Sequence, residues 1–148
     1  MFGLLLRVLS IVGTMASVMN CDTKSVFTIT SMSFSPDPTI PGQNSTLQLS
    51  LEVPTEITGG TATYDTMYNF IPFAPVVDPL CGTVVCPIKV GPLSTWSSYP
   101  MDFALSGRLT IKITWRDSTD RVLMCVSVRT TLGDSTRQVG LRRNSSHH

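Results

Sequence analysis

Apolar residues that recur at every second position constrain the fold of this chain more than any other feature of its sequence. Residues 46–53, 109–116 and 122–129 each alternate large apolar residues with mainly polar ones. This period of two predicts β-strands with one face buried and the other face in water or against a covering loop. Three further segments, residues 26–34, 61–70 and 93–98, have the composition of strands. The expected strands are therefore residues 26–34, 46–53, 61–70, 93–98, 109–116 and 122–129.

Turn-forming residues separate these expected strands. Proline and glycine interrupt residues 35–42, two glycines lie at Gly59-Gly60, and residues 117–120 are expected to form a polar hairpin. Residues 71–79 hold three prolines and are expected to form a loop, because proline is excluded from inner strands. Ten prolines and ten glycines leave no window for a long helix. The pattern predicts an all-β fold, an immunoglobulin-like sandwich of two antiparallel sheets.

The two ends of the chain differ from its middle. Residues 1–16 hold an apolar run followed by small residues, which is typical of a secretory signal peptide; a buried first strand or helix is the alternative. Residues 17–132 are expected to form one domain, and residues 133–148, which lack periodicity, a disordered tail. The N-x-S/T triplets at Asn44 and Asn144 are candidate glycosylation sites and agree with a secretory route.

The four cysteines also favour an oxidising compartment, because an even count in a short chain with a leader is typical of a disulfide framework. Four cysteines permit three pairings. The four residues between Cys81 and Cys86 suit a local disulfide loop, which leaves Cys21 to pair with Cys125. The spacing is not C-x-x-C and the only two histidines end the chain, so no metal site is expected.

Composition and missing motifs exclude several classes of function. The net charge of +1 gives no basic domain face for nucleic acid. No histidine precedes His147, so Ser-His-Asp and Cys-His catalysis lack a residue that they need. Nucleotide-binding glycine motifs and the nucleophile elbow are missing as well. We therefore expect no enzyme and no cofactor. With only 14% charged residues, a binding protein that hides or uses apolar surface is favoured.

Short motifs follow one another along the domain in a specific order. They are Phe34-Ser35-Pro36-Asp37-Pro38, Pro41-Gly42, residues 57–62, Cys86-Pro87-Ile88-Lys89, Gly91-Pro92, residues 109–115 and Leu123-Met124-Cys125. The C-P-I-K step directly after the short cysteine loop is the most specific of them. In this order, residues 21–132 resemble the ML family, the MD-2-related lipid-recognition domains. The resemblance implies the same two disulfides, Cys81 with Cys86 and Cys21 with Cys125.

The resemblance also implies a function and a site. It implies a lipid-binding and lipid-transfer protein, secreted or lumenal in endosomes and lysosomes, that carries a sterol or phospholipid in an apolar cavity between two sheets. Phe73, before the short cysteine loop, and Met101, after the Tyr99-Pro100 step, are expected at the two rims of the cavity mouth. The other candidate lining residues are Leu49, Leu51, Tyr64, Phe70, Leu109, Ile111, Ile113, Met124 and Val126.

Two alternatives stay open at this point. For any one strand residue, ordinary core packing explains the pattern as well as lipid contact does. The second hypothesis for the whole chain is a non-transferring interaction module, either an ML-type receptor accessory protein or an adhesion-like sandwich with a solid core. A solid sandwich would not retain lipid through purification, and an accessory protein would not move lipid between vesicles. The expected partners are a lipid ligand, transient contact with a membrane and a membrane-protein acceptor, with the protein itself a monomer.

Overall fold

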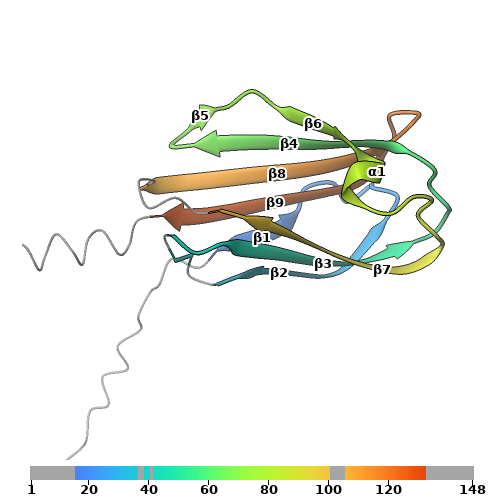
Figure 1. Cartoon of the computed structure of the whole chain (residues 1–148), viewed down its shortest axis with the longest axis horizontal. Coiled ribbons are helices and arrows are strands. Elements are labelled where there is room, and N and C mark those ends of the chain that lie inside the picture. Colours follow the sequence, from blue (N-terminus) through green and yellow to red (C-terminus); the bar gives the residue numbers. More distant parts are fainter. Residues whose placement is uncertain (1–15, 37–38, 41, 101–105, 133–148) are drawn as a thin grey trace, which may run out of the picture.

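The computed structural model describes residues 16–36, 39–40, 42–100 and 106–132, which are almost entirely β-structure (Figure 1). The elements are β1 (Ser17–Asn20), β2 (Thr28–Ser35), β3 (Ser45–Val53), β4 (Gly60–Tyr68), β5 (Ile71–Pro72), β6 (Val76–Pro79), α1 (Leu80–Thr83), β7 (Gly91–Tyr99), β8 (Gly107–Asp117) and β9 (Val122–Leu132). All six expected strands are present, with ends that differ by a few residues. Within the described ranges, no helix is long and apolar enough to cross a membrane.

The expected segments at the two ends cannot be compared with the fold. The expected leader, residues 1–16, lies outside the described residues except for Ala16, and the expected tail, residues 133–148, lies outside them entirely. Asn144 and Met101 also lie outside the described residues. Asn44 is described and lies exposed just before β3.

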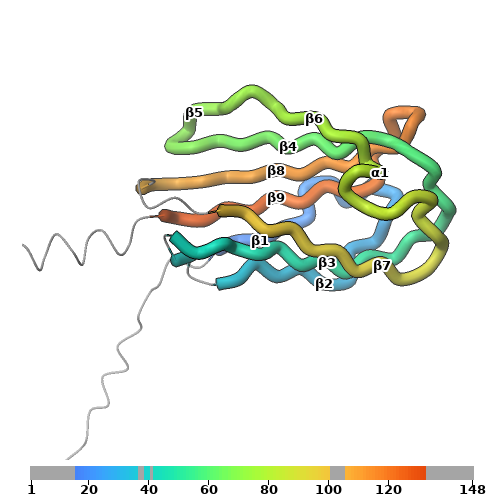
Figure 2. Tube along the Cα trace, viewed as in Figure 1, coloured from blue at the N-terminus to red at the C-terminus, as the bar shows by residue number. Residues whose placement is uncertain are grey.

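The strands form two antiparallel sheets that stack as a sandwich (Figure 2). The larger sheet has the order β1-β9-β8-β4-β5, with β6 also paired to β4, and the smaller sheet has the order β2-β3-β7. The register of the smaller sheet pairs Leu49 with Thr95, and that of the larger sheet pairs Tyr64 with Ile113. Because residues paired across an antiparallel ladder point to the same face, these registers decide which side chains face the space between the sheets. The predicted two-sheet β-sandwich is confirmed.

The core lies between β3 of the smaller sheet and β8 and β9 of the larger one. Burial along β3 alternates strictly from Ser45 to Val53, as the period of two predicts. Each fully buried leucine, isoleucine or valine on these faces contributes about 1.5–3 kcal/mol. On the outer face of β9, Cys125 is buried as well, because it is bonded to Cys21 and lies against the Thr114 hydroxyl of β8.

Residues 71–79 correct one expectation, since they do not form a loop throughout. They form the two short strands β5 and β6, which pair with the free edge of β4. An edge strand tolerates proline because one side of its backbone needs no ladder partner. The prolines correctly predict that this segment is not an inner strand. Its pairing with β4 depends on the path of the chain after the β4–β5 turn, which no local pattern predicts.

Both expected disulfides are present. Cys81 is bonded to Cys86 across the end of α1, and Cys21 is bonded to Cys125 across β1 and β9. The backbone N–H of Cys21 also donates to the Cys125 carbonyl. The longer disulfide therefore ties the first strand of the domain to a central strand of the larger sheet.

The hairpin between β8 and β9 gives a prediction on pH dependence. The Asp117 carboxylate accepts hydrogen bonds from the Thr119 hydroxyl and from the backbone N–H groups of Thr119 and Arg121. The Thr119 hydroxyl, followed by the Arg121 backbone, lowers the pKa of Asp117 from 3.8 to about 2. A lowered pKa means that the ionised carboxylate stabilises the fold above its unfolded pKa, and that this stabilisation disappears as the pH falls toward 2.

We therefore expect Asp117→Asn to lower the urea midpoint of unfolding at pH 7 and to have almost no effect at pH 2. The experiment compares urea unfolding of wild type and variant at both pH values. A difference between the two proteins that stays constant across this pH range would contradict the assignment.

Candidate functional site

β4 of the larger sheet and β7 of the smaller sheet lie on the side of the sandwich that is opposite β1 and β2. Inward-facing side chains of β3, β8 and β9 are buried; on β4 Ala62 is buried as well, but the other inward side chains of β4 and those of β7 are only half-buried. The half-buried residues are Tyr64, Thr66 and Tyr68 on β4, and Leu93, Thr95, Ser97 and Tyr99 on β7. Since these positions share a face with fully buried partners across their ladders, their exposure indicates an opening between β4 and β7.

On the opposite side the sandwich is closed. There β1 and β9 of the larger sheet contact β2 of the smaller one. The Cys21–Cys125 disulfide lies on this closed side. One side of the sandwich is therefore tied by β1 and a disulfide, whereas on the other side the inward faces of β4 and β7 are partly exposed.

Tyrosine hydroxyls provide the polar groups of this opening. Burial raises the pKa of Tyr99 to about 12; nearby Ser97 offsets part of this rise, and the proximity of Tyr64 adds to it. Tyr64 of β4 and Tyr99 of β7 both pack against the apolar core. Among the described residues, the Tyr99 hydroxyl has no hydrogen bond of ordinary geometry, and a buried hydroxyl without a partner costs about 1–3 kcal/mol.

The Tyr68 hydroxyl, in contrast, is fixed. It donates to the carbonyl of Ser106 and accepts from the Ser106 N–H. This pair of bonds holds the start of β8 against the end of β4. Among the described residues, the hydroxyl of Tyr68 is thus fixed by the chain itself, whereas that of Tyr99 is buried without a hydrogen bond of ordinary geometry.

Most of the candidate lining residues lie between the sheets. The buried ones are Leu49, Leu51, Leu109, Ile111, Ile113, Met124 and Val126, with Tyr64 half-buried among them. These residues form the apolar core next to the half-buried residues of β4 and β7. Their burial agrees with lipid contact and with plain core packing alike, so their role as lining stays a prediction.

Two other candidates lie elsewhere. Phe70 is at the tip of the β4–β5 turn, 71% exposed, under the Arg108 guanidinium at 5.2 Å from the ring centroid. Arg108 is on the outer face of the larger sheet, so Phe70 does not lie between the sheets. Phe73 is 54% exposed, and its N–H donates to the Thr66 carbonyl at the edge of the sheet. Its place as a rim residue is still a prediction.

The inward residues of β7 were not predicted as part of the site, although the strand itself was predicted. Leu93, Thr95 and Ser97 alternate with Ser94 and Trp96, but only one of the three inward residues is strongly apolar. The apolar period therefore gave no signal there. No group of three or more potential metal ligands occurs within the described ranges.

Comparison with known proteins defines the class. The family model described as ML domain matches residues 16–132, which span the whole described part of the chain. The chain is a member of the ML-domain family, and the predicted family is confirmed. The comparison with curated proteins gave no match.

Two solved structures share the fold. A Niemann-Pick type C2 protein from Japanese carpenter ant superimposes with a TM-score of 0.58 at 16% identity, covering 78% of this chain and 98% of the ant protein. Chicken MD-1, solved in complex with lipid IVa, superimposes with a TM-score of 0.58 at 14% identity, covering 80% of this chain and 90% of MD-1. At these identities the likeness establishes the fold alone.

Proposed function

We propose that this protein binds one lipid molecule between its two sheets, with the apolar tail on the core floor and the polar end near Tyr99 and Tyr64. The observation that carries the proposal is the half-buried inward face of β7 and of β4 from Tyr64 to Tyr68, which contrasts with the buried inward faces of β3, β8 and β9. Membership of the ML-domain family and the lipid bound to chicken MD-1 support the same function.

The expected affinity suits a carrier. Each methylene removed from water stabilises the complex by about 0.8 kcal/mol, so about ten methylenes give roughly 8 kcal/mol. This corresponds to a dissociation constant of around 1 μM. Such a complex is stable enough to form and weak enough to release its lipid, and we propose lipid transfer, with a sterol or a phospholipid as cargo.

The secretory route belongs to the same proposal. Two disulfides within one small domain persist only where the compartment is oxidising, which is the secretory pathway or the lumen that it feeds. The exposure of Asn44 before β3 leaves its amide accessible to glycosylation. We propose that the protein is secreted or lumenal and acts as a monomer that contacts membranes transiently.

Native mass spectrometry of the secreted protein tests the function. We expect a mass excess of one lipid per chain that disappears after extraction with organic solvent, and we expect the extract to contain a sterol or a phospholipid. Protein that carries no lipid, and takes none up from vesicles, would contradict the proposal and leave a sandwich with a solid core.

A second candidate is lipid presentation without transfer. It is supported by the fold shared with chicken MD-1, which was solved with lipid IVa bound. Transfer of a fluorescent phospholipid between donor and acceptor vesicles separates the two functions. A carrier accelerates this transfer in proportion to its concentration, whereas a presenting protein retains its lipid and leaves the transfer rate unchanged.

A further inference from the structure

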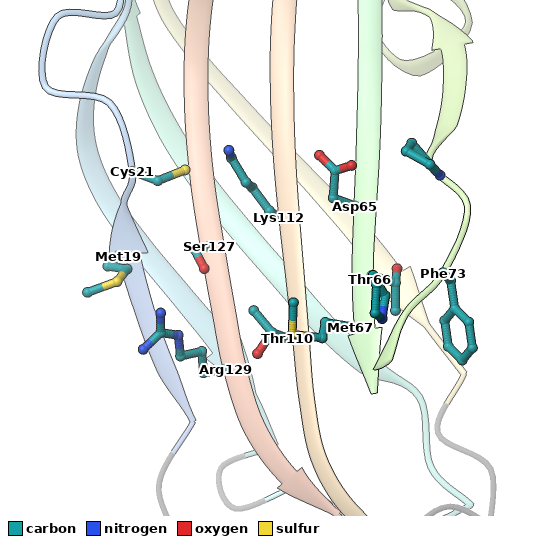
Figure 3. A pocket seen from close by; sticks show the side chains of 12 residues that line it. Met19, Cys21, Asp65, Thr66, Met67, Phe73, Thr110, Lys112, Ser127 and Arg129 are labelled. Atoms are coloured by element: carbon teal, nitrogen blue, oxygen red, sulfur yellow. The ribbon is translucent and has the colours of Figure 1, made fainter. Parts of the chain in front are cut away.

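The outer face of the larger sheet carries a trough that reaches the edge of β4. It has a volume of about 510 Å³ (Figure 3). Met19 of β1 lines one side, Met67 of β4 and Phe73 line the other, and the short side chains of Thr110 and Ser127 line the strands between them. A second hollow of about 270 Å³ shares Met67 and Thr110 and continues toward the β4–β5 turn.

Positive charge gathers on this face. Arg108, Lys112 and Arg129 line the two hollows, against the single carboxylate of Asp65. Asp65 is opposite Lys112 in the ladder of β4 and β8. Figure 3 nevertheless shows the Lys112 side chain pointing toward β9 and away from the Asp65 carboxylate. Among the described residues, no ion pair within 4.0 Å joins any of these three cations to a carboxylate. Within the described part of the chain, this face therefore has cations without a carboxylate partner, although the domain as a whole is slightly acidic.

An aromatic residue projects from the end of this face at a local conformational cost. In the two-residue turn between β4 and β5, Asn69 has φ +49° and Phe70 has φ +65°. A turn with two left-handed residues strongly prefers glycine at its second position, and a bulky residue is an outlier there. Phe70 is nevertheless 71% exposed, and its neighbour Ile71 is 62% exposed. Since fold stability favours glycine at position 70, the exposed ring points to a role outside folding.

We propose that this end of the outer face docks on the surface of an anionic lipid bilayer. Phe70 and Ile71 enter the headgroup region, and Arg108, Lys112 and Arg129 contact lipid phosphates. An aromatic tip beside unpaired cations is the combination that holds peripheral proteins on anionic membranes. The inference rests on the proposed function, because a lipid carrier has to touch the membrane with which it exchanges lipid, and it names the surface that does so.

Sedimentation with vesicles tests the inference, using phosphatidylcholine alone and phosphatidylcholine mixed with phosphatidylglycerol. Wild type is expected to bind the mixed vesicles, less at high salt, and to bind phosphatidylcholine weakly. Arg108→Gln combined with Arg129→Gln is expected to weaken binding roughly 25-fold, since each cation near an anionic surface adds about fivefold. Phe70→Gly is expected to weaken it about tenfold through the lost burial of the ring.

Stability separates docking from a structural role of Phe70. Glycine relieves the left-handed backbone, which offsets the lost contact with Arg108, so the thermal midpoint of Phe70→Gly is expected to equal or exceed that of wild type. Trp96→Ala is the matched aromatic control, because Trp96 is 70% exposed on the smaller sheet. Lys24→Gln with Lys89→Gln is the matched charge control. Both controls are expected to bind mixed vesicles like wild type.

The outcomes that overturn the inference differ from those that overturn lipid binding. Docking would be refuted if wild type did not bind mixed vesicles, or if the Phe70 and arginine variants bound them as wild type does. Neither result would change the lipid content measured by mass spectrometry. Loss of retained lipid together with docking in Phe70→Gly would place Phe70 in the lipid site itself and would also overturn the inference. Lost docking with normal lipid content supports it.

Discussion

Replacing Cys21 and Cys125 together by alanine is expected to lower the free energy of unfolding by nearly 5 kcal/mol. These cysteines are separated by 104 residues, so their bond restricts almost the whole unfolded domain. Replacing Cys81 and Cys86, which are five residues apart, is expected to cost about 2 kcal/mol, because closing a short loop removes little chain entropy. A loss near 5 kcal/mol is comparable with the whole stability of a domain of this size.

Urea unfolding of the two double variants measures the difference. The short-loop variant is the internal control, since it also removes two sulfur atoms and one bond. The long disulfide lies on the closed side of the sandwich, so at temperatures where its variant still folds we expect unchanged lipid affinity. Equal destabilisation by the two double variants would show that loop length does not decide the contribution of either bond.

The sequence predicted the strands because their signal is local. Residues 46–53 and 109–116 have one apolar face each, and β3 and β8 bury those faces. The two disulfides were also predictable, since the short loop leaves only one partner for Cys21. These features depend on spacing along the chain, and spacing can be read without the fold.

The site was less predictable because it depends on relations between sheets. Residues 71–79 form edge strands as a result of pairing with β4, and no local pattern marks an edge. Phe70 has the composition of a lining residue, but the backbone of a two-residue turn directs it to the outer face. Whether Leu93 and Thr95 are buried or half-buried depends on how far two sheets splay, and the alternation of residues along β7 is the same in both cases.

A bulky side chain placed inside the opening is expected to block lipid binding without unfolding the protein. Thr95 lies on the inward, half-buried face of β7, opposite Leu49 in the ladder. Tryptophan at this position is expected to displace about three methylenes of lipid, a loss of roughly 2.4 kcal/mol or about 50-fold in affinity. Because the site is open, the larger ring needs no rearrangement of the core, and the thermal midpoint is expected to change by only a few degrees.

The adjacent residue supplies the matched control. Ser94 lies on the same strand and is exposed on the outward face, so Ser94→Trp adds the same ring with the same local strand propensity outside the opening. It is expected to bind lipid like wild type. If tryptophan anywhere on β7 weakened lipid binding, the lipid affinity of both variants would fall equally.

Titration of lipid-free wild type, Thr95→Trp and Ser94→Trp with a fluorescent sterol and a fluorescent phospholipid tests the central claim most directly. If the lipid lies between the sheets, at least one probe binds wild type and Ser94→Trp with micromolar affinity and Thr95→Trp about 50-fold more weakly. If all three proteins bind the probes equally while remaining folded, the lipid does not occupy the opening between β4 and β7.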